Sequence, residues 1–272
     1  MLVGFPAFLR IVQDFATIKM KLLFENWRKY KSRILLEVAK GPKQLPDSVY
    51  LGIFELNNPS KEVVFYYCDV DGNRLKKRNE YGDFESDFEG RQVFATKEEP
   101  TGTLYIGPTE NEYDGKCLGA YSINWSAADQ GWGPMLYDIA IEYASKNGGG
   151  LISDRASLSD EAFDVWDYYM KKRADVDRAQ LDDLRGTLTP NFKMDDCNQG
   201  IAFDKLGYDM YDGGDIYQNY SQWDLMYDKP EKYKRELLDS PISKVYVKNP
   251  TVTNSLAQMG KLIVNGKLIG TE

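Results

Sequence analysis

The chain has 272 residues, of which 42% are hydrophobic and 13% aromatic, which is enough for a large domain with a sizeable core. Its 34 basic and 42 acidic residues give a net charge of −8, which argues against a general nucleic-acid-binding protein. Histidine is absent. This excludes Ser-His-Asp and Cys-His mechanisms and makes most zinc enzymes untenable.

The three cysteines, Cys68, Cys117 and Cys197, are odd in number and lie far apart. This spacing predicts neither a disulfide framework nor a metal site. We therefore expect a reducing, cytoplasmic compartment and no bound metal.

Residues 1–40 are predicted to form an amphipathic helical segment that is covered by other parts of the protein or by a partner. Charged residues interrupt its apolar run, and a basic leader with a cleavage site is missing, so we expect no membrane span and no signal peptide. The interrupting residues are Arg10, Asp14 and Lys19, and the apolar residues at helical spacing are Phe8, Ile11, Val12, Phe15 and Ile18.

The next part of the chain is typical of β-structure, with short runs rich in β-branched and aromatic residues between turn signals. An acidic segment rich in breakers, residues 78–90, predicts a loop. The predicted strands are residues 48–56, 62–70, 91–96, 101–107 and 116–126, with residues 74–77 in a hairpin after the second.

The segment "DQGWGPMLYDIAIEYASKNGGG", residues 129–150, predicts a glycine-rich turn followed by a helix over 134–147. Leu136, Ile139, Ala140 and Tyr143 lie on one face of that helix. A short buried strand at 151–154 and a second helix from an N-cap at Ser159 to Arg173 follow. This alternation of strands and helices predicts an α/β protein with a mixed sheet.

After Arg173 the pattern is polar, tyrosine-rich and irregular. Residues 243–249 are predicted to form a late strand and residues 251–263 a short helix. We therefore divide the chain into the N-terminal segment, a central domain over 45–185 and a C-terminal extension over 186–272 that packs on the same domain.

Gly131 and Gly133 stand where a predicted strand enters a helix. Helix N-termini carry unpaired N–H groups and the positive end of the helix dipole, and glycines let a phosphate approach them closely. Two glycines alone are a weak signal, and for the bare pattern a structural turn is the favoured explanation. The segment matches neither a P-loop nor a dinucleotide-binding fingerprint.

The order of strand, "GWG" loop, helix, short strand and helix over residues 116–173 resembles the GCN5-related N-acetyltransferase (GNAT) superfamily. Gly131 and Gly133 match the glycines of its acetyl-CoA loop, whose Arg or Gln falls on Ala128 in this chain. The following helix matches at Leu136, Ala140, Ala144 and Gly148, and the second helix matches at Ala162.

The resemblance implies that acetyl-CoA is a co-substrate, bound where two parallel strands diverge, and that an amine of a small molecule or protein accepts the acetyl group. The implied acid is Tyr168, with Tyr169 as the alternative on the core-facing side, and the implied base is Glu112 or its neighbours Glu110 and Asp114. The implied cofactor-binding residues are Ile123, Asn124, Asp129, Gln130, Gly131, Trp132, Gly133 and Met135.

Two other interpretations stay open. The chain could keep a GNAT-like fold as an inactive binding or structural protein, since its family tyrosine position falls on Trp166. It could also be an α/β protein with an unrelated ligand. The segment "LLFENWRKY" and the acidic, tyrosine-rich composition resemble proteins of large tailed bacteriophages. This resemblance implies that the protein is located in the host cytoplasm or in the virion. The pattern leaves the oligomeric state open.

Overall fold

The computed structural model describes residues 39–77, 91–109, 113–205 and 222–270. From Lys40 onward these residues belong to one compact unit. The predicted helical segment before residue 39 and the predicted loop 78–90 lie outside the described residues.

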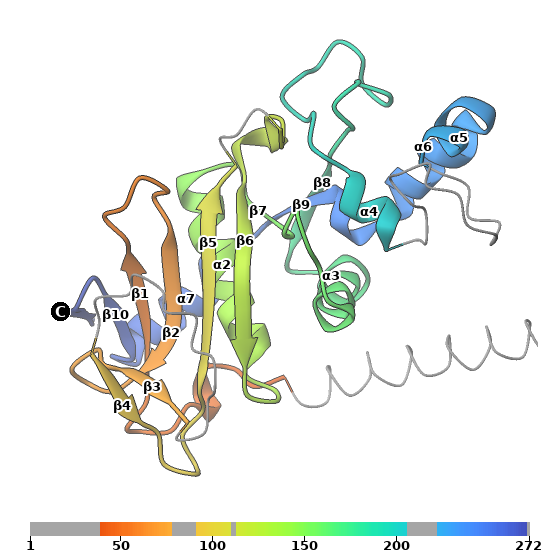
Figure 1. Ribbon diagram of the computed structural model, residues 1–272. Helices are drawn as coiled ribbons and strands as arrows, with labels where there is room; N and C mark the ends of the chain where they lie inside the picture. The colour runs from red at the N-terminus through yellow and green to blue at the C-terminus, as the bar shows by residue number, and fades with distance from the viewer. Residues whose placement is uncertain (1–38, 78–90, 110–112, 206–221, 271–272) are drawn as a thin grey trace, which may run out of the picture. The chain divides into compact units, whose positions relative to one another are not determined.

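An eleven-stranded mixed sheet organises this unit (Figure 1), which confirms the expected α/β class with a mixed sheet. Nine strands follow one path in the order β11-β10-β1-β2-β5-β6-β7-β9-β8, and β3 joins β2 to β4 off that path. The strands are β1 (Tyr50–Glu55), β2 (Val63–Cys68), β3 (Arg74–Lys76), β4 (Gln92–Phe94), β5 (Gly102–Pro108), β6 (Tyr121–Ala128), β7 (Leu151–Ile152), β8 (Asp177–Gln180), β9 (Lys244–Val247), β10 (Leu262–Val264) and β11 (Lys267–Ile269).

Strands β6 and β7 are parallel neighbours, as predicted, and the chain between them contains helix α2 (Gly133–Asn147). On the other side of β6, the strands β5, β2 and β1 continue the sheet as antiparallel neighbours. Only two residue pairs join β6 to β7, namely Tyr121 with Leu151 and Ser122 with Ile152. The pairing stops there because β7 ends at Ile152, and the rest of this edge of β6 has no paired strand among the described residues.

Five more α-helices and three short 3₁₀ helices complete the described elements. Ser159 caps α3 as predicted, because its side chain accepts a hydrogen bond from the Ala162 N–H at 3.2 Å. The remaining helices are α3 (Asp160–Lys172), α4 (Gly200–Asp204), α5 (Gln222–Asp228), α6 (Pro230–Asp239), α7 (Thr251–Gln258), η1 (Pro42–Gln44), η2 (Cys117–Gly119) and η3 (Pro241–Ser243).

The main hydrophobic core lies between the sheet and α2. The predicted face of α2 is buried, with Leu136, Ile139 and Ala140 at most 1% exposed. These side chains join one cluster with residues of β2 and β5, such as Phe65 and Leu104. Because hydrophobic burial is the main stabilising term, this cluster fixes the position of α2 beneath the sheet.

The structure corrects the predicted strand over 116–126, since β6 begins only at Tyr121. Cys117 and Leu118 have φ values of +43° and +57°, which no extended strand allows. A disulfide joins Cys117 to Cys197, so the expectation that the cysteines stay unpaired is also wrong for these two. Spacing in sequence could not reveal this bond, because its partners are 80 residues apart.

The predicted C-terminal extension supplies strands to both ends of the sheet. Strand β9 lies between β7 and β8, whereas β10 pairs with β1 at the opposite end. The predicted helix over 251–263 ends earlier, at Gln258, and Leu262 begins β10. Strand β8 and helices α4 and α6 are elements that the weak pattern after Arg173 did not predict.

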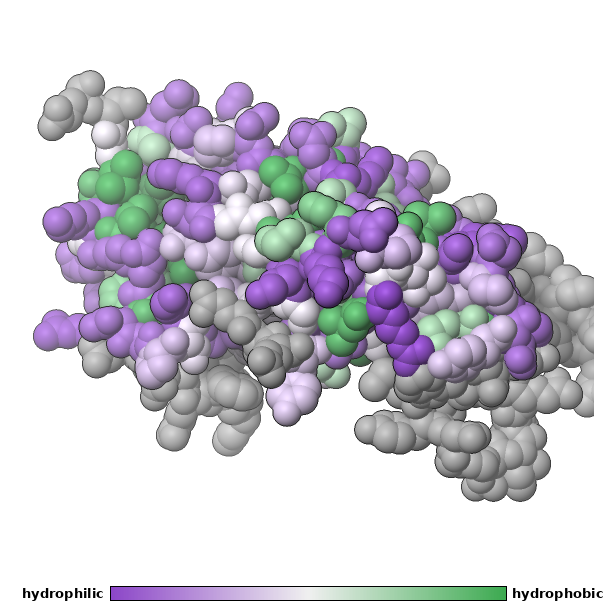
Figure 2. Space-filling model, turned by 90° about the horizontal axis from the view of Figure 1, so that it is seen from above, coloured by the Kyte–Doolittle hydropathy of each residue, from purple (hydrophilic) through white to green (hydrophobic). Residues whose placement is uncertain are grey.

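The surface seen in Figure 2 is mostly hydrophilic, and its hydrophobic side chains lie in small separated groups. In the part of the chain that the structure describes, no helix has both the length and the apolar character needed to cross a bilayer.

Candidate functional site

A cleft of about 170 Å³ opens beside β6, beyond the end of its pairing with β7. Its walls come from β6, from α2, from the segment that follows β7 and from the first turns of α3. The lining residues are Ile123, Asn124, Trp125, Ser126, Tyr137, Asp154, Ser157, Leu158, Ser159, Ala162 and Trp166.

A β-bulge in β6 shapes the wall of this cleft. Tyr105 of β5 pairs with Trp125 and Ile106 pairs with Ile123, so Asn124 is the extra residue. Ile123 therefore packs in the core beneath α2, whereas Trp125 packs against Tyr105 on the opposite face of the sheet, with ring centroids 5.9 Å apart. The bulge thus places Ile123 and Trp125 on opposite faces of the sheet, whereas a regular strand would place both on the same face.

Tyr137 and Ser126 bring two hydroxyl groups together at the cleft. The Tyr137 hydroxyl lies 3.1 Å from Ser126 Oγ. Tyr137 is buried beside Trp166, and burial raises the pKa of its phenol although the hydrogen bond with Ser126 opposes the shift. Tyr137 is therefore a protonated group at neutral pH that could donate a proton inside the cleft.

The segment after β7 places a carboxylate on the cleft wall. Asp154 Oδ1 accepts hydrogen bonds from the Ala156 N–H at 2.7 Å and the Ser157 N–H at 3.3 Å. Arg155 points the other way and is buried, where it donates to the carbonyl oxygens of Asn198 and Ile242. Burial lowers the pKa of Arg155 to about 10, which still leaves it charged at neutral pH. Arg155 thus anchors the segment that carries Asp154.

The glycine loop connects β6 to α2, next to the cleft. Gly131 has a φ of +83°, a conformation that strongly favours glycine, and its carbonyl accepts a hydrogen bond from Lys40 N–H at 2.9 Å. Helix α2 begins at Gly133. The N–H groups of its first turn have no partner within the helix, so they are the donors that a phosphate would need.

Two side chains of the loop have structural partners. The Asp129 carboxylate accepts hydrogen bonds from the Thr101 N–H at 2.8 Å and hydroxyl at 3.1 Å, and it forms an ion pair with Lys77. Trp132 is 6% exposed and packs edge-on against Tyr67 at 5.7 Å. These contacts hold the loop in place.

The remaining predicted cofactor-binding residues are divided between core and surface. Met135 is 1% exposed and belongs to the core, so only its backbone could meet a ligand. The Gln130 side chain is exposed. Ile123 and Asn124 line the cleft.

The predicted acids do not line the cleft. Tyr169 is fully buried, with its hydroxyl 3.0 Å from Asp138 Oδ1 and 3.1 Å from the Pro134 carbonyl oxygen. This supports the expectation that Tyr169 packs in the core. Tyr168 is 8% exposed and packs edge-on against Tyr169 at 5.7 Å.

Of the three predicted bases, only Asp114 lies among the described residues. Glu110 and Glu112 lie outside the described residues. Asp114 is described, and burial raises the pKa of its carboxyl, but it does not line the cleft. Among the polar residues that do line it, Tyr137, Ser126 and Asp154 were not predicted. Nothing in the sequence around Tyr137 distinguishes it from a core residue of α2. Only the packing of α2 against β6 brings its hydroxyl beside Ser126.

Comparisons with family models, with curated proteins and with solved structures found no match to this chain.

Proposed function

We propose that the protein is an acetyl-CoA-dependent N-acyltransferase. The observation that carries this proposal is the cleft beside β6 at the point where its pairing with the parallel strand β7 ends, before the glycine loop and α2. An extended thioester cofactor needs both features at once, namely backbone groups along a strand and anion-binding N–H groups at its end.

In this proposal the free edge of β6 holds the amide groups of the pantetheine arm. Among the described residues, no strand pairs with this edge of β6 beyond Ser122, so its backbone donors and acceptors face the cleft. The pyrophosphate then lies at the first turn of α2, where the helix dipole favours negative charge. Lys77 and Lys40 lie near this loop and add positive charge.

The chemistry would proceed by direct transfer. The neutral amine attacks the thioester carbonyl carbon, a C–N bond forms, and the C–S bond breaks to release the CoA thiolate. Tyr137 donates its proton to that thiolate, and Asp154, directly or through water, accepts the proton that the amine loses. Most of the rate enhancement would come from holding amine and thioester in line.

A binding or structural protein of the same fold is the second candidate. The Asp129 carboxylate favours it, because this negative charge stands in the loop where the pyrophosphate would bind. The ion pair with Lys77 offsets that charge only in part, since Lys77 is half exposed to solvent.

Calorimetry with acetyl-CoA and with CoA separates the two candidates. We expect both ligands to bind and to raise the melting temperature. Gly133→Val should abolish binding because its side chain would cover the N–H groups of the first turn. A Cβ at Gly133 meets only Ala128 Cβ, at 3.8 Å, so the fold should tolerate the change.

Gly270→Val is the matched control, because nothing lies within 4 Å of a Cβ at that position. This variant should bind like the native chain. Equal binding by Gly133→Val would reject the phosphate role of the loop. Absence of binding by the native chain would reject the enzyme and favour the structural protein.

A further inference from the structure

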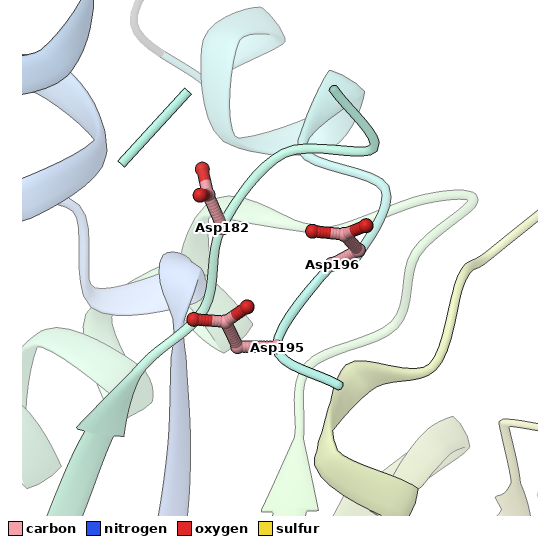
Figure 3. Close-up of side chains that lie close together, drawn as sticks. All are labelled: Asp182, Asp195 and Asp196. Atoms are coloured by element: carbon pink, nitrogen blue, oxygen red, sulfur yellow. The ribbon is translucent and has the colours of Figure 1, made fainter. Parts of the chain in front are cut away.

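Three aspartates outside the cleft bring their carboxylates together in the loop after β8. Asp182 leaves the strand, and Asp195 and Asp196 lie on the segment that returns beside it (Figure 3). One carboxylate oxygen from each residue lies within 4.8 Å of the others. Asp182 is fully buried and Asp195 is 7% exposed. Like charges at this distance repel one another strongly when they are buried.

The backbone holds these two segments in a defined register. The Asp182 N–H donates to the Asp195 carbonyl at 2.8 Å, and the Cys197 N–H donates to the Asp182 carbonyl at 2.9 Å. The disulfide from Cys197 to Cys117 ties the returning segment to η2. The carboxylates are thus kept close by covalent and backbone bonds, whatever their mutual repulsion.

The hydrogen-bond partners of the three carboxylates differ. Both oxygens of Asp182 accept backbone hydrogen bonds, Oδ1 from Asp183 N–H at 2.7 Å and Oδ2 from Thr189 N–H at 2.6 Å. Asp195 Oδ2 accepts one from the Thr189 hydroxyl at 2.7 Å. Asp195 Oδ1 and Asp196 Oδ1 are buried and have no hydrogen-bond partner among the described residues.

Asp183, the next residue along the loop, shows what a purely structural aspartate looks like here. Its carboxylate accepts hydrogen bonds from Arg185 N–H, Thr187 N–H, the Thr187 hydroxyl and the Tyr233 hydroxyl. It has a donor for each oxygen, whereas Asp195 and Asp196 each lack one. A buried carboxylate oxygen without a partner carries a large desolvation cost.

Positive charge is scarce around the cluster. Among the described residues, no Lys or Arg forms an ion pair with Asp182, Asp195 or Asp196. Among the described residues, the cluster therefore has no ion-paired cation, and two of its buried carboxylate oxygens have no hydrogen-bond donor.

We propose that Asp182, Asp195 and Asp196 bind a divalent cation of the calcium type, with Asp195 Oδ1 and Asp196 Oδ1 as its first ligands. A donor set made only of carboxylate oxygens suits a hard cation. Calcium binds oxygen at about 2.3–2.6 Å in flexible geometry, so carboxylate oxygens that lie within 4.8 Å of one another can share it, whereas magnesium demands near-ideal octahedral geometry and keeps several waters. The cation would fasten the loop beside the disulfide.

Calorimetry and thermal melts of the full chain, freed of metal by a chelator, test this proposal with CaCl₂ and MgCl₂ as probes. We expect calcium to bind and to raise the melting temperature by several degrees, and magnesium to bind more weakly. Asp195→Asn and Asp196→Asn should each weaken calcium binding by about tenfold or more, because each removes a charged ligand. Asp177→Asn, an exposed change of the same charge on β8, should bind calcium normally.

The melts in chelator distinguish a cation site from a structural role. There, Asp196→Asn should melt at the same temperature as the native chain or higher, because it relieves repulsion. An equal loss of stability with and without calcium would overturn the proposal, as would the absence of any calcium effect on the native chain. Tighter binding of magnesium than of calcium would overturn the calcium assignment.

Discussion

At the scale of single residues, hydroxyl position separates catalytic candidates from core residues. Tyr137 of α2 lines the cleft and contacts Ser126, whereas Tyr168 and Tyr169 of α3 do not line the cleft and pack against each other. Helical spacing predicted correctly that Tyr169 faces the core. It could not identify Tyr137, because that residue belongs to the buried part of α2 and meets the cleft only through the bulge in β6.

Tyr137→Phe should slow acetyl transfer by about a hundredfold or more, since it removes the proton donor and keeps the ring. Turnover of acetyl-CoA against a panel of amines measures this. Tyr168→Phe is the matched control and should leave turnover unchanged, because its hydroxyl does not line the cleft. The opposite result, a slow Tyr168→Phe and an unaffected Tyr137→Phe, would return the role to Tyr168.

At the scale of elements, the buried carboxylate of Glu142 joins α2 to α7. Glu142 of α2 accepts hydrogen bonds from Val252 N–H and Thr253 N–H, both at 2.8 Å, at the start of α7. It also pairs with Lys248, and both side chains are 1% exposed. Because no side chain of α7 itself caps that helix, Glu142 performs this function from another element.

Glu142→Gln should lower the free energy of unfolding by about 3–5 kcal/mol, because it leaves the Lys248 charge buried without a partner. Urea denaturation measures this change. The double variant Glu142→Gln with Lys248→Met should recover much of the loss, since it removes the stranded charge as well. A double variant as unstable as the sum of both single variants would show that the pair is not the cause.

At the scale of the whole molecule, buried tyrosines link stability to pH. Burial raises the pKa of Tyr67, Tyr169 and Tyr246 above the ordinary value of 10.0. Tyr67 and Tyr246 also donate hydrogen bonds to backbone carbonyls, at 2.7 Å and 2.6 Å, that a phenolate could not donate. In the unfolded chain these phenols would ionise near pH 10.

Above pH 10 the folded chain keeps phenolic protons that the unfolded chain loses. The contribution of these tyrosines to the free energy of unfolding should therefore be fully present below pH 10 and should be lost as the pH rises further. Thermal melts across this range, recorded together with tyrosinate absorbance, provide the check. We expect a late rise in absorbance that coincides with unfolding. Early ionisation of most of the 19 tyrosines in a chain that stays folded would contradict the burial of these rings.

Local pattern was sufficient for several elements of the central domain, although not for the start of β6 or for β8. Runs rich in β-branched and aromatic residues predicted β1, β2 and β5, helical spacing predicted α2 and α3, and Ser159 marked the start of α3. These features depend on neighbours in sequence, so the sequence by itself determined them.

Only the tertiary structure decided the contacts between distant segments. The disulfide joins residues 80 apart, and the bulge at Asn124 exists only relative to β5. Likewise, Asp182 meets Asp195 and Asp196 because backbone hydrogen bonds bring two segments of one loop side by side. The cleft and the aspartate cluster arise from long-range register, and register is set by packing against elements that no local pattern can place.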